Sequence, residues 1–182
     1  MSAVQPDPLR DLLAAASEGD DHAFAMLVRE TSDELLRFCA RLGTEQGAED
    51  LVQETYLRAV RGAGAFRGDS AVRTWLMGIA RHVCADELRR TGKARRTLRA
   101  FASARLPRNV AASVESSWVD VDDQLLSILG REQREAFVLT RLMGWSYVEA
   151  AEALGCPVGT VRSRVARARA QLADVNRAWE AG

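Results

Sequence analysis

The feature that most constrains this chain is the stretch from residue 144 to residue 169, where a short apolar-faced segment, a tight turn and an arginine-rich segment follow one another. Ser146 is a favourable helix N-cap, and Glu149 stands where a capping box places its acidic residue. Gly155 suits the left-handed end of a helix, and Pro157 cannot continue it. The stripe of this first helix that we expect to face inward consists of Val148, Ala151 and Leu154. The stretch therefore predicts a helix-turn-helix unit.

The second helix of the unit carries positive charge without compensating acids. It is predicted to begin at Gly159 or Thr160, and no acid lies between Gly155 and Leu172. Its apolar face consists of Val161, Val165, Ala168 and Leu172, and the arginines around that face are Arg162, Arg164, Arg167 and Arg169. On a helix that is merely solvated, arginine usually alternates with glutamate. We therefore predict that this helix enters the major groove of DNA, against the alternative of a surface hairpin with a solvated basic face.

Charge along the chain is distributed in blocks, although the formal net charge is zero. Acids dominate residues 1–60, arginines dominate residues 61–108, and acids lead again over residues 115–135. Such blocks predict an acidic surface for one partner and basic surfaces for a polyanion. Lys93 is the only lysine, so the arginine content also reflects coding bias, and the placement of the arginines matters more than their number.

The reactive side chains form no recognisable catalytic or metal-binding pattern. The three cysteines are widely separated without a C-x-x-C pair, which argues against a disulfide framework or a zinc site and fits a reducing cytosol. His82 and Asp86 share a helical face but lack a third ligand, and with Cys84 they lack a nucleophile-base-orienter constellation. We expect no catalytic residue, metal, cofactor or small-molecule substrate. Without a signal peptide or long apolar run, the protein is expected to be soluble, cytoplasmic and not inserted into a membrane.

Helical periodicity recurs along the chain, and no strand pattern of any length interrupts it. The predicted fold class is therefore all-α. Residues 1–8 are expected to be a disordered tail. Helices are predicted over residues 9–17, 45–61, 70–90 and 131–143. Further N-caps are predicted at Asp20 or Asp21, at Ser32 or Asp33, and at Asp69 or Ser70. The sequence therefore predicts two small helical domains joined by a flexible basic linker.

The helix predicted over residues 45–61 carries two different stripes. The stripe expected to face inward consists of Ala48, Leu51, Val52, Thr55 and Ala59. The other, which we call the acidic stripe, consists of Asp50, Gln53, Glu54 and Leu57. A leucine among carboxylates on an exposed stripe is typical of a protein interface. A solvated helix with one stray leucine explains the same pattern, and the residues alone leave both interpretations open.

The glycine-rich loop after this helix displays an aromatic and a basic side chain, Phe66 and Arg67, beside a helix rich in arginine. An aromatic platform next to basic groups is what single-stranded nucleic acid requires for stacking and for neutralising phosphates. Trp75 is in phase with Leu76 and Ile79 and is expected in the core. Phe66 is therefore the better stacking candidate.

Three stretches together resemble the extracytoplasmic-function (ECF) subgroup of the sigma-70 family of bacterial RNA polymerase sigma factors. They are residues 48–59, 66–82 and 156–169, and their order and separation also match. The resemblance covers about residues 12–90 and 125–172. It implies a sigma-2 domain over residues 9–92, a linker over residues 93–119, and a sigma-4 domain with the helix-turn-helix over residues 120–178.

The resemblance also implies roles for individual residues of the first domain. The acidic stripe would dock on the clamp helices of the largest subunit of core RNA polymerase. The 66–70 loop would receive a base flipped from the minus-10 element; its residues are Phe66, Arg67, Gly68, Asp69 and Ser70. Arg81 and His82 would help to form the pocket and approach DNA. Related sequences often have asparagine in place of His82, so the preferred base stays open.

In the second domain, the resemblance implies readout of the minus-35 element. The positions that match base-facing residues are Arg162, Ser163, Ala166 and Arg167, and the expected phosphate contacts are Ser146, Tyr147, Thr160, Arg164 and Arg169. The implied function is promoter-specific initiation with core polymerase, under control of an anti-sigma factor as in many relatives. The competing hypothesis is an autonomous regulator with a LuxR-like helix-turn-helix, in which the acidic stripe and the 66–70 loop have no role.

Overall fold

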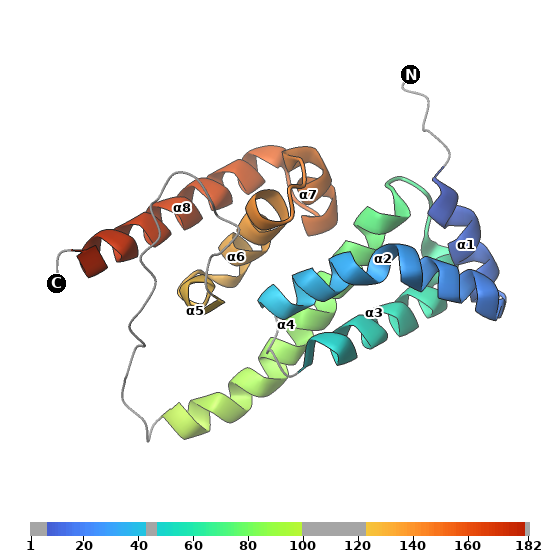
Figure 1. Ribbon diagram of the computed structural model, residues 1–182, viewed down its shortest axis with the longest axis horizontal. Coiled ribbons are helices and arrows are strands. Elements are labelled where there is room, and N and C mark those ends of the chain that lie inside the picture. Colours follow the sequence, from blue (N-terminus) through green and yellow to red (C-terminus); the bar gives the residue numbers. More distant parts are fainter. Residues whose placement is uncertain (1–6, 43–46, 100–122, 181–182) are drawn as a thin grey trace.

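The computed structural model describes residues 7–42, 47–99 and 123–180, and every regular element in these ranges is helical (Figure 1). The all-α prediction is therefore confirmed for this part of the chain. The rest of the predicted tail and the predicted linker beyond residue 99 lie outside the described residues.

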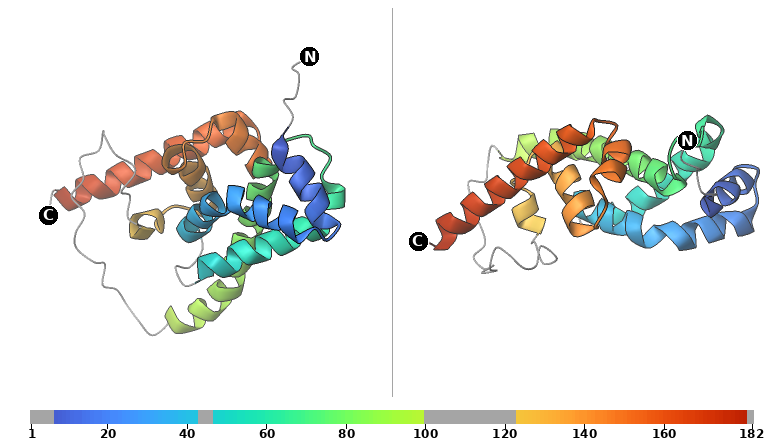
Figure 2. Two further views of the ribbon diagram at one scale, coloured as in Figure 1. Left: turned by 45° about the vertical axis from the view of Figure 1, so that its right-hand side comes forward. Right: turned by 90° about the horizontal axis from the view of Figure 1, so that it is seen from above.

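The helices form two groups that follow the two ends of the chain. The first contains α1 (Pro8–Ser17), α2 (Asp21–Leu42), α3 (Ala48–Gly62), the 3-10 turn η2 (Ala63–Ala65) and α4 (Val72–Arg99). The second contains α5 (Asp123–Leu126), α6 (Arg131–Phe137), the π-helical turn η4 (Val138–Leu142), α7 (Tyr147–Leu154) and α8 (Val158–Glu180). The second group lies beside α2 and α4, and α8 extends away from the body (Figures 1 and 2).

Helix α2 is one continuous helix, and the predicted break at Ser32 or Asp33 is wrong. Its start agrees with the prediction, because Asp20 Oδ1 accepts hydrogen bonds from the backbone N–H groups of His22 and Ala23 at 2.9 and 3.0 Å. At the predicted break, Thr31 Oγ1 donates to the Leu27 carbonyl at 2.7 Å, so a polar side chain is satisfied inside the helix. Buried leucines on both sides then hold the helix in one core, since tertiary burial outweighs weak local preferences.

The N-terminus of α4 is capped by a residue distant in sequence. Asp7 Oδ2 accepts from the Val72 N–H at 2.7 Å, and Asp7 Oδ1 accepts from the Leu9 N–H at 3.1 Å, where Asp7 is the N-cap of α1. The cap predicted from Asp69 or Ser70 is therefore wrong. Asp7, predicted to belong to the tail, is part of the fold, and α4 continues to Arg99, into the predicted linker.

Helix α7 packs closely on α4 and joins the two groups. A Cβ added at Gly78 of α4 would lie 3.3 Å from the Ala153 carbonyl oxygen of α7, so the two backbones approach closely here. The side of α7 that is buried between α4 and α8 consists of Ala150, Ala151, Ala153 and Leu154. Val148, predicted to face inward, is 56% exposed, because the small alanines rather than the valine allow this approach.

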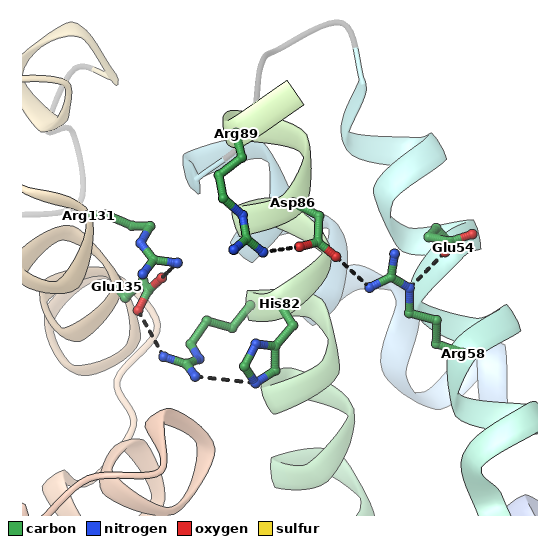
Figure 3. Close-up of polar contacts among 8 residues, drawn as sticks. Glu54, Arg58, His82, Asp86, Arg89, Arg131 and Glu135 are labelled. Carbon is green, nitrogen blue, oxygen red and sulfur yellow. Dashed lines mark hydrogen bonds and ion pairs between the residues drawn. The ribbon is translucent and has the colours of Figure 1, made fainter. Parts of the chain in front are cut away.

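Polar contacts accompany this packing. Trp145 Nε1 donates to Glu34 Oε1 of α2 at 2.7 Å, and Arg73 Nη1 of α4 lies 3.4 Å from Glu34 Oε2. Glu135 of α6 is 1% exposed, and its Oε2 lies 3.5 Å from Arg81 Nη1 of α4 in an ion pair without hydrogen-bond geometry (Figure 3). These contacts link the two groups by charge as well as by apolar burial.

Burial raises the pKa of the Glu135 carboxyl above its ordinary value. The positive charges that oppose this shift come from three helices: Arg81 of α4, Arg131 of α6 and Arg164 of α8. The desolvation of the ionised carboxyl therefore outweighs its attraction to these arginines.

Replacing Glu135 with glutamine should change how stability depends on pH. A carboxyl whose pKa is raised by folding stabilises the fold most below its unfolded pKa, near 4.5, and this contribution is lost as pH rises through the raised folded value. As pH rises from 4.5, the free energy of unfolding of Glu135→Gln should increase relative to the wild type, by about 1.4 kcal/mol for each pH unit that separates the unfolded and folded pKa values. Urea unfolding of both full chains from ~pH 4 to ~pH 8 measures this, and a difference that is constant with pH would contradict the assignment.

Candidate nucleic-acid interface

The turn between α7 and α8 is built as its sequence predicts. Ser146 Oγ accepts from the Glu149 N–H at 3.2 Å, and Glu149 Oε2 accepts from the Ser146 N–H at 2.9 Å, which completes the capping box. These bonds from Ser146 lower the pKa of the Glu149 carboxyl. Gly155 ends α7 in the left-handed conformation, with φ 61°. The geometry of this turn fixes the direction in which α8 leaves α7.

Helix α8 has a buried and an exposed side. The predicted apolar face is confirmed, since Val161, Val165, Ala168 and Leu172 are all buried. Of the predicted base-facing residues, Arg162, Ala166 and Arg167 are exposed, as is Arg169. Ser163 is half-buried, and its Oγ donates to the Thr160 carbonyl at 2.9 Å. The side chains predicted to face bases are thus carried on one helix whose opposite side is buried in the core.

Arg164 differs from the other arginines of α8. Its side chain is only 16% exposed, its Nη2 lies 2.6 Å from Glu132 Oε2 of α6, and its Nη1 donates to Cys156 Sγ at 3.4 Å. It therefore joins α8 to α6 and to the turn before α8. The absence of acids within the basic stretch concealed this pairing, because the partner carboxylate comes from a distant helix.

Tyr147 brings two arginines together at the start of α7. The guanidinium carbons of Arg141 and Arg162 lie 6.0 and 5.8 Å from its ring centroid, and Arg141 Nη2 donates to the Tyr147 hydroxyl at 3.0 Å. Distances of this size allow cation–π attraction. Tyr147 thus restrains Arg162, and Arg141 is a basic neighbour that sequence reasoning missed, since it lies outside the helix-turn-helix.

In the first group, the 66–70 loop presents charged side chains from a fixed backbone. The Phe66 ring is half-buried and lies 5.1 Å from the ring of Trp75, which is itself only half-buried rather than fully in the core. Arg67 Nε and Asp69 Oδ2 are 3.1 Å apart, and both side chains are largely exposed. Gly68 adopts φ 76°, a conformation that favours glycine.

Arg81 and His82 lie on α4, and each has a neighbour within the protein. Arg81 has a side chain 19% exposed and faces Glu135 of the second group. His82 Nε2 accepts from Arg81 Nη2 at 3.3 Å, and partial burial, followed by the Arg81 charge, lowers the pKa of the His82 imidazole. The imidazole is therefore neutral near pH 7, consistent with its accepting role.

The acidic stripe lies on the surface of α3. Asp50 and Gln53 are exposed, and Leu57 is 51% exposed, whereas the inner stripe of α3 is buried as predicted. An apolar groove between α2 and α3 borders it, lined by residues that include Phe24, Val28, Tyr56, Val60 and Leu57. An exposed leucine at the edge of an apolar groove favours a protein interface over a stray surface residue.

Glu54 of the acidic stripe is held by a chain of charges that reaches α4 (Figure 3). Arg58 Nε lies 2.7 Å from Glu54 Oε1, and Arg58 Nη1 lies 2.8 Å from Asp86 Oδ2. Arg89 also pairs with Asp86. Hydrogen bonds from Arg58 and Arg89 lower the pKa of the Asp86 carboxyl, so it stays ionised and serves this network.

Within the described ranges, the structure groups no three histidine, cysteine or acidic side chains in a way that would hold a metal ion. Nor does any helix in these ranges combine the length and the hydropathy that crossing a bilayer requires.

Comparison with known families identifies both groups of helices. The family model for sigma-70 region 2 matches residues 27–96, and the model for sigma-70, region 4 matches residues 123–172. The two matches cover well over half of the chain. They contain the acidic stripe, the 66–70 loop and the helix-turn-helix.

Individual proteins agree with the family models. The ECF RNA polymerase sigma factor SigC of Mycobacterium tuberculosis is 40% identical over 180 residues, covering 95% of this chain and 94% of the relative. CnrH, solved in complex with the cytosolic domain of CnrY, matches with TM-score 0.68 and 30% identity, over 93% of this chain and 97% of that chain. The sigma factor RpoE, solved with the anti-sigma factor NepR from Bartonella quintana, matches with TM-score 0.65 and 29% identity, over 85% and 96%.

These matches confirm the predicted family and rule out the competing hypothesis of an autonomous LuxR-like regulator. The chain belongs to the ECF subgroup of the sigma-70 family, whose members direct transcription initiation by RNA polymerase.

Proposed function

We propose that this sigma factor engages the promoter at two points and core polymerase at a third. The sigma-4 domain, residues 120–178, reads the minus-35 element through α8. The sigma-2 domain, residues 9–92, takes a flipped minus-10 base at the 66–70 loop and docks its acidic stripe on the clamp helices of the largest polymerase subunit. The observation that carries the proposal is the exposed arginine side of α8, opposite a fully buried apolar face.

Readout by α8 divides between bases and phosphates. An arginine that donates two hydrogen bonds to guanine discriminates by roughly 1–3 kcal/mol against another base. Arg162 and Arg167 are assigned this role together with Ser163 and Ala166, and the short Ala166 side chain fits a thymine methyl. Phosphate contacts are assigned to Arg169, Thr160, Ser146 and Tyr147. Such contacts add salt-dependent affinity without sequence information. For Arg164, also expected to contact phosphate, that role requires its guanidinium to release Glu132.

Opening of the duplex is assigned to the first domain. Extruding one base costs a few kcal/mol of stacking and pairing, which a pocket must offset. Arg81 and His82 are assigned to the approach of this strand. Arg81 is paired with Glu135, so its use on DNA requires that this contact opens and the second group moves away from α4. A neutral His82 presents a hydrogen-bonding edge rather than a charge to the strand.

Polymerase and an anti-sigma factor are the proposed protein partners. The RpoE relative is solved with its anti-sigma factor NepR, and by this similarity we propose that an anti-sigma factor also binds this chain. The proposed location is the cytoplasm, where polymerase acts. Run-off transcription with purified core polymerase on a promoter library tests the whole proposal, because the chain alone should confer initiation on core.

Two arginine variants separate recognition of bases from electrostatic attraction to phosphates. Arg167→Ala should relax selectivity at one minus-35 position by roughly 1–3 kcal/mol. Arg169→Ala should instead lower the binding affinity for all minus-35 sequences alike, and it should reduce the slope of log affinity against log salt concentration by about one. The measurement is holoenzyme binding to minus-35 variants at several salt concentrations. If Arg169→Ala changes the preferred sequence and Arg167→Ala does not, the two roles are assigned the wrong way round.

Shortening Leu57 should weaken binding to core polymerase. Because the side chain is 51% exposed, Leu57→Ala should leave folding nearly unchanged, while the loss of a central apolar contact should cost about 2 kcal/mol of affinity. Val148→Ala is the matched control, since Val148 is 56% exposed on a different helix. Fluorescence anisotropy of the labelled full chain titrated with core gives both affinities. Equal losses in the two variants would speak against a docking role for the stripe.

A further inference from the structure

We propose that the N-terminus of α1 is part of the minus-10 recognition apparatus, with Arg10 as a positioning residue for the 66–70 loop and Asp7 as its anchor. This inference rests on the proposed function of the loop. Both residues lie outside residues 27–96, the range matched by the region 2 model. Their contacts join α1 to the loop itself and to α4 at the point where the loop ends.

Asp7 fixes the end of the loop. One carboxylate oxygen accepts from the Val72 N–H at 2.7 Å and the other from the Leu9 N–H at 3.1 Å. The same side chain therefore caps two helix N-termini, where a negative charge is also favoured by the helix dipoles. The start of α4, and with it the exit of the loop, is tied to the start of α1.

Arg10 holds the loop itself. Its Nη2 donates to the Arg67 carbonyl at 3.1 Å, and its guanidinium carbon lies 5.7 Å from the Phe66 ring centroid. Phe66 thus contacts Arg10 as well as Trp75. The backbone of the loop is held from the protein side, while the side chains of Arg67 and Asp69 are 84% and 75% exposed. This is the arrangement expected of a loop that presents groups to a ligand from a fixed frame.

Gly68 shows how closely the guanidinium approaches. A Cβ at this position would lie 1.9 Å from Arg10 Nη2 and 2.4 Å from Arg10 Cζ, so any side chain here would displace the guanidinium. Gly68 also has φ 76°, which only glycine adopts at little cost. The positive φ of Gly68 and its lack of a side chain therefore both allow the loop to pack against the Arg10 guanidinium.

The chemistry of these contacts favours positioning over direct binding of phosphate. A guanidinium is planar, donates along fixed directions and stacks on an aromatic ring, whereas a lysine ammonium is a point charge without this geometry. Arg10 directs its Nη2 at a backbone carbonyl, and its guanidinium carbon lies near the Phe66 ring. A phosphate contact would need only the charge, and this difference separates the two roles by experiment.

The test is run-off transcription by holoenzymes made with the full chain, on promoters that carry each of the four bases at the flipped minus-10 position. Arg10→Ala should reduce the preference for the best base by about tenfold, as for loss of one ordinary contact. Arg10→Lys should reduce it similarly, since charge alone does not hold the loop. Arg29→Ala, which removes an exposed arginine of α2, is the matched control and should leave the preference unchanged.

A double-mutant cycle with Gly68→Ala tests whether Arg10 and the loop act together on the base preference. Because part of the cost of the added methyl is the clash with Arg10, Gly68→Ala should reduce the base preference less in the Arg10→Ala background than in the wild type. Hydrogen exchange of the backbone amides of residues 66–71 in the full chain should be faster in Arg10→Ala, and thermal unfolding verifies that each variant is folded.

Several results would overturn the proposal. Rescue by Arg10→Lys, or an equal loss of transcription on all four promoters, would make Arg10 a phosphate contact. Additive effects of Arg10→Ala and Gly68→Ala would remove the coupling. The proposed function is tested separately by Phe66→Ala: if this variant keeps the base preference, the loop is not the reader. If it loses the preference while Arg10→Ala retains it, only the positioning role fails.

Discussion

The close packing of α7 on α4 is the contact on which the rest of the arrangement depends. It requires Gly78 on one helix and small residues on the other, because a larger side chain would hold the backbones apart. Once the backbones are close, Trp145 donates a hydrogen bond to Glu34, and the buried Glu135 forms an ion pair with Arg81. A buried carboxylate is costly, and arginines from three helices around Glu135 offset only part of this cost. Apolar burial and charge contacts therefore both join the two helical groups, and their charge contacts depend on the protonation of Glu135.

The arginines illustrate how environment sorts one residue type into several roles. Arg164 is paired inside the second group, Arg162 lies over Tyr147 on the exposed side of α8, and Arg81 bridges the two groups. Arg58 connects Glu54 of the acidic stripe to Asp86 of α4. Each role follows from where the nearest carboxylate or ring lies in space. Counting basic residues along the chain would have treated all four as equivalent contacts for DNA.

The same point applies to the start of the chain, where the sequence predicts that Asp7 belongs to the tail and Arg10 to a helix over residues 9–17. Asp7 and Arg10 connect α1 to residues more than half a domain away in sequence, and they do so through a backbone N–H, a backbone carbonyl and the face of a ring. Backbone groups leave no signature in a sequence pattern. The dependence of the 66–70 loop on α1 therefore becomes visible only when the helices are placed together.

The sequence by itself determined the all-α class, the inner stripes of α3 and α8, and the turn between α7 and α8, because each depends on residues within a few positions of one another. It also determined the family, because the motifs and their order and spacing can be identified in the sequence without the structure. Tertiary structure alone decided that α2 runs without a break, that Asp7 caps α4, that Val148 is exposed and that Arg164 pairs with Glu132. In each of these cases the deciding partner is distant in sequence, and burial against it outweighs the local preference from which the prediction was made.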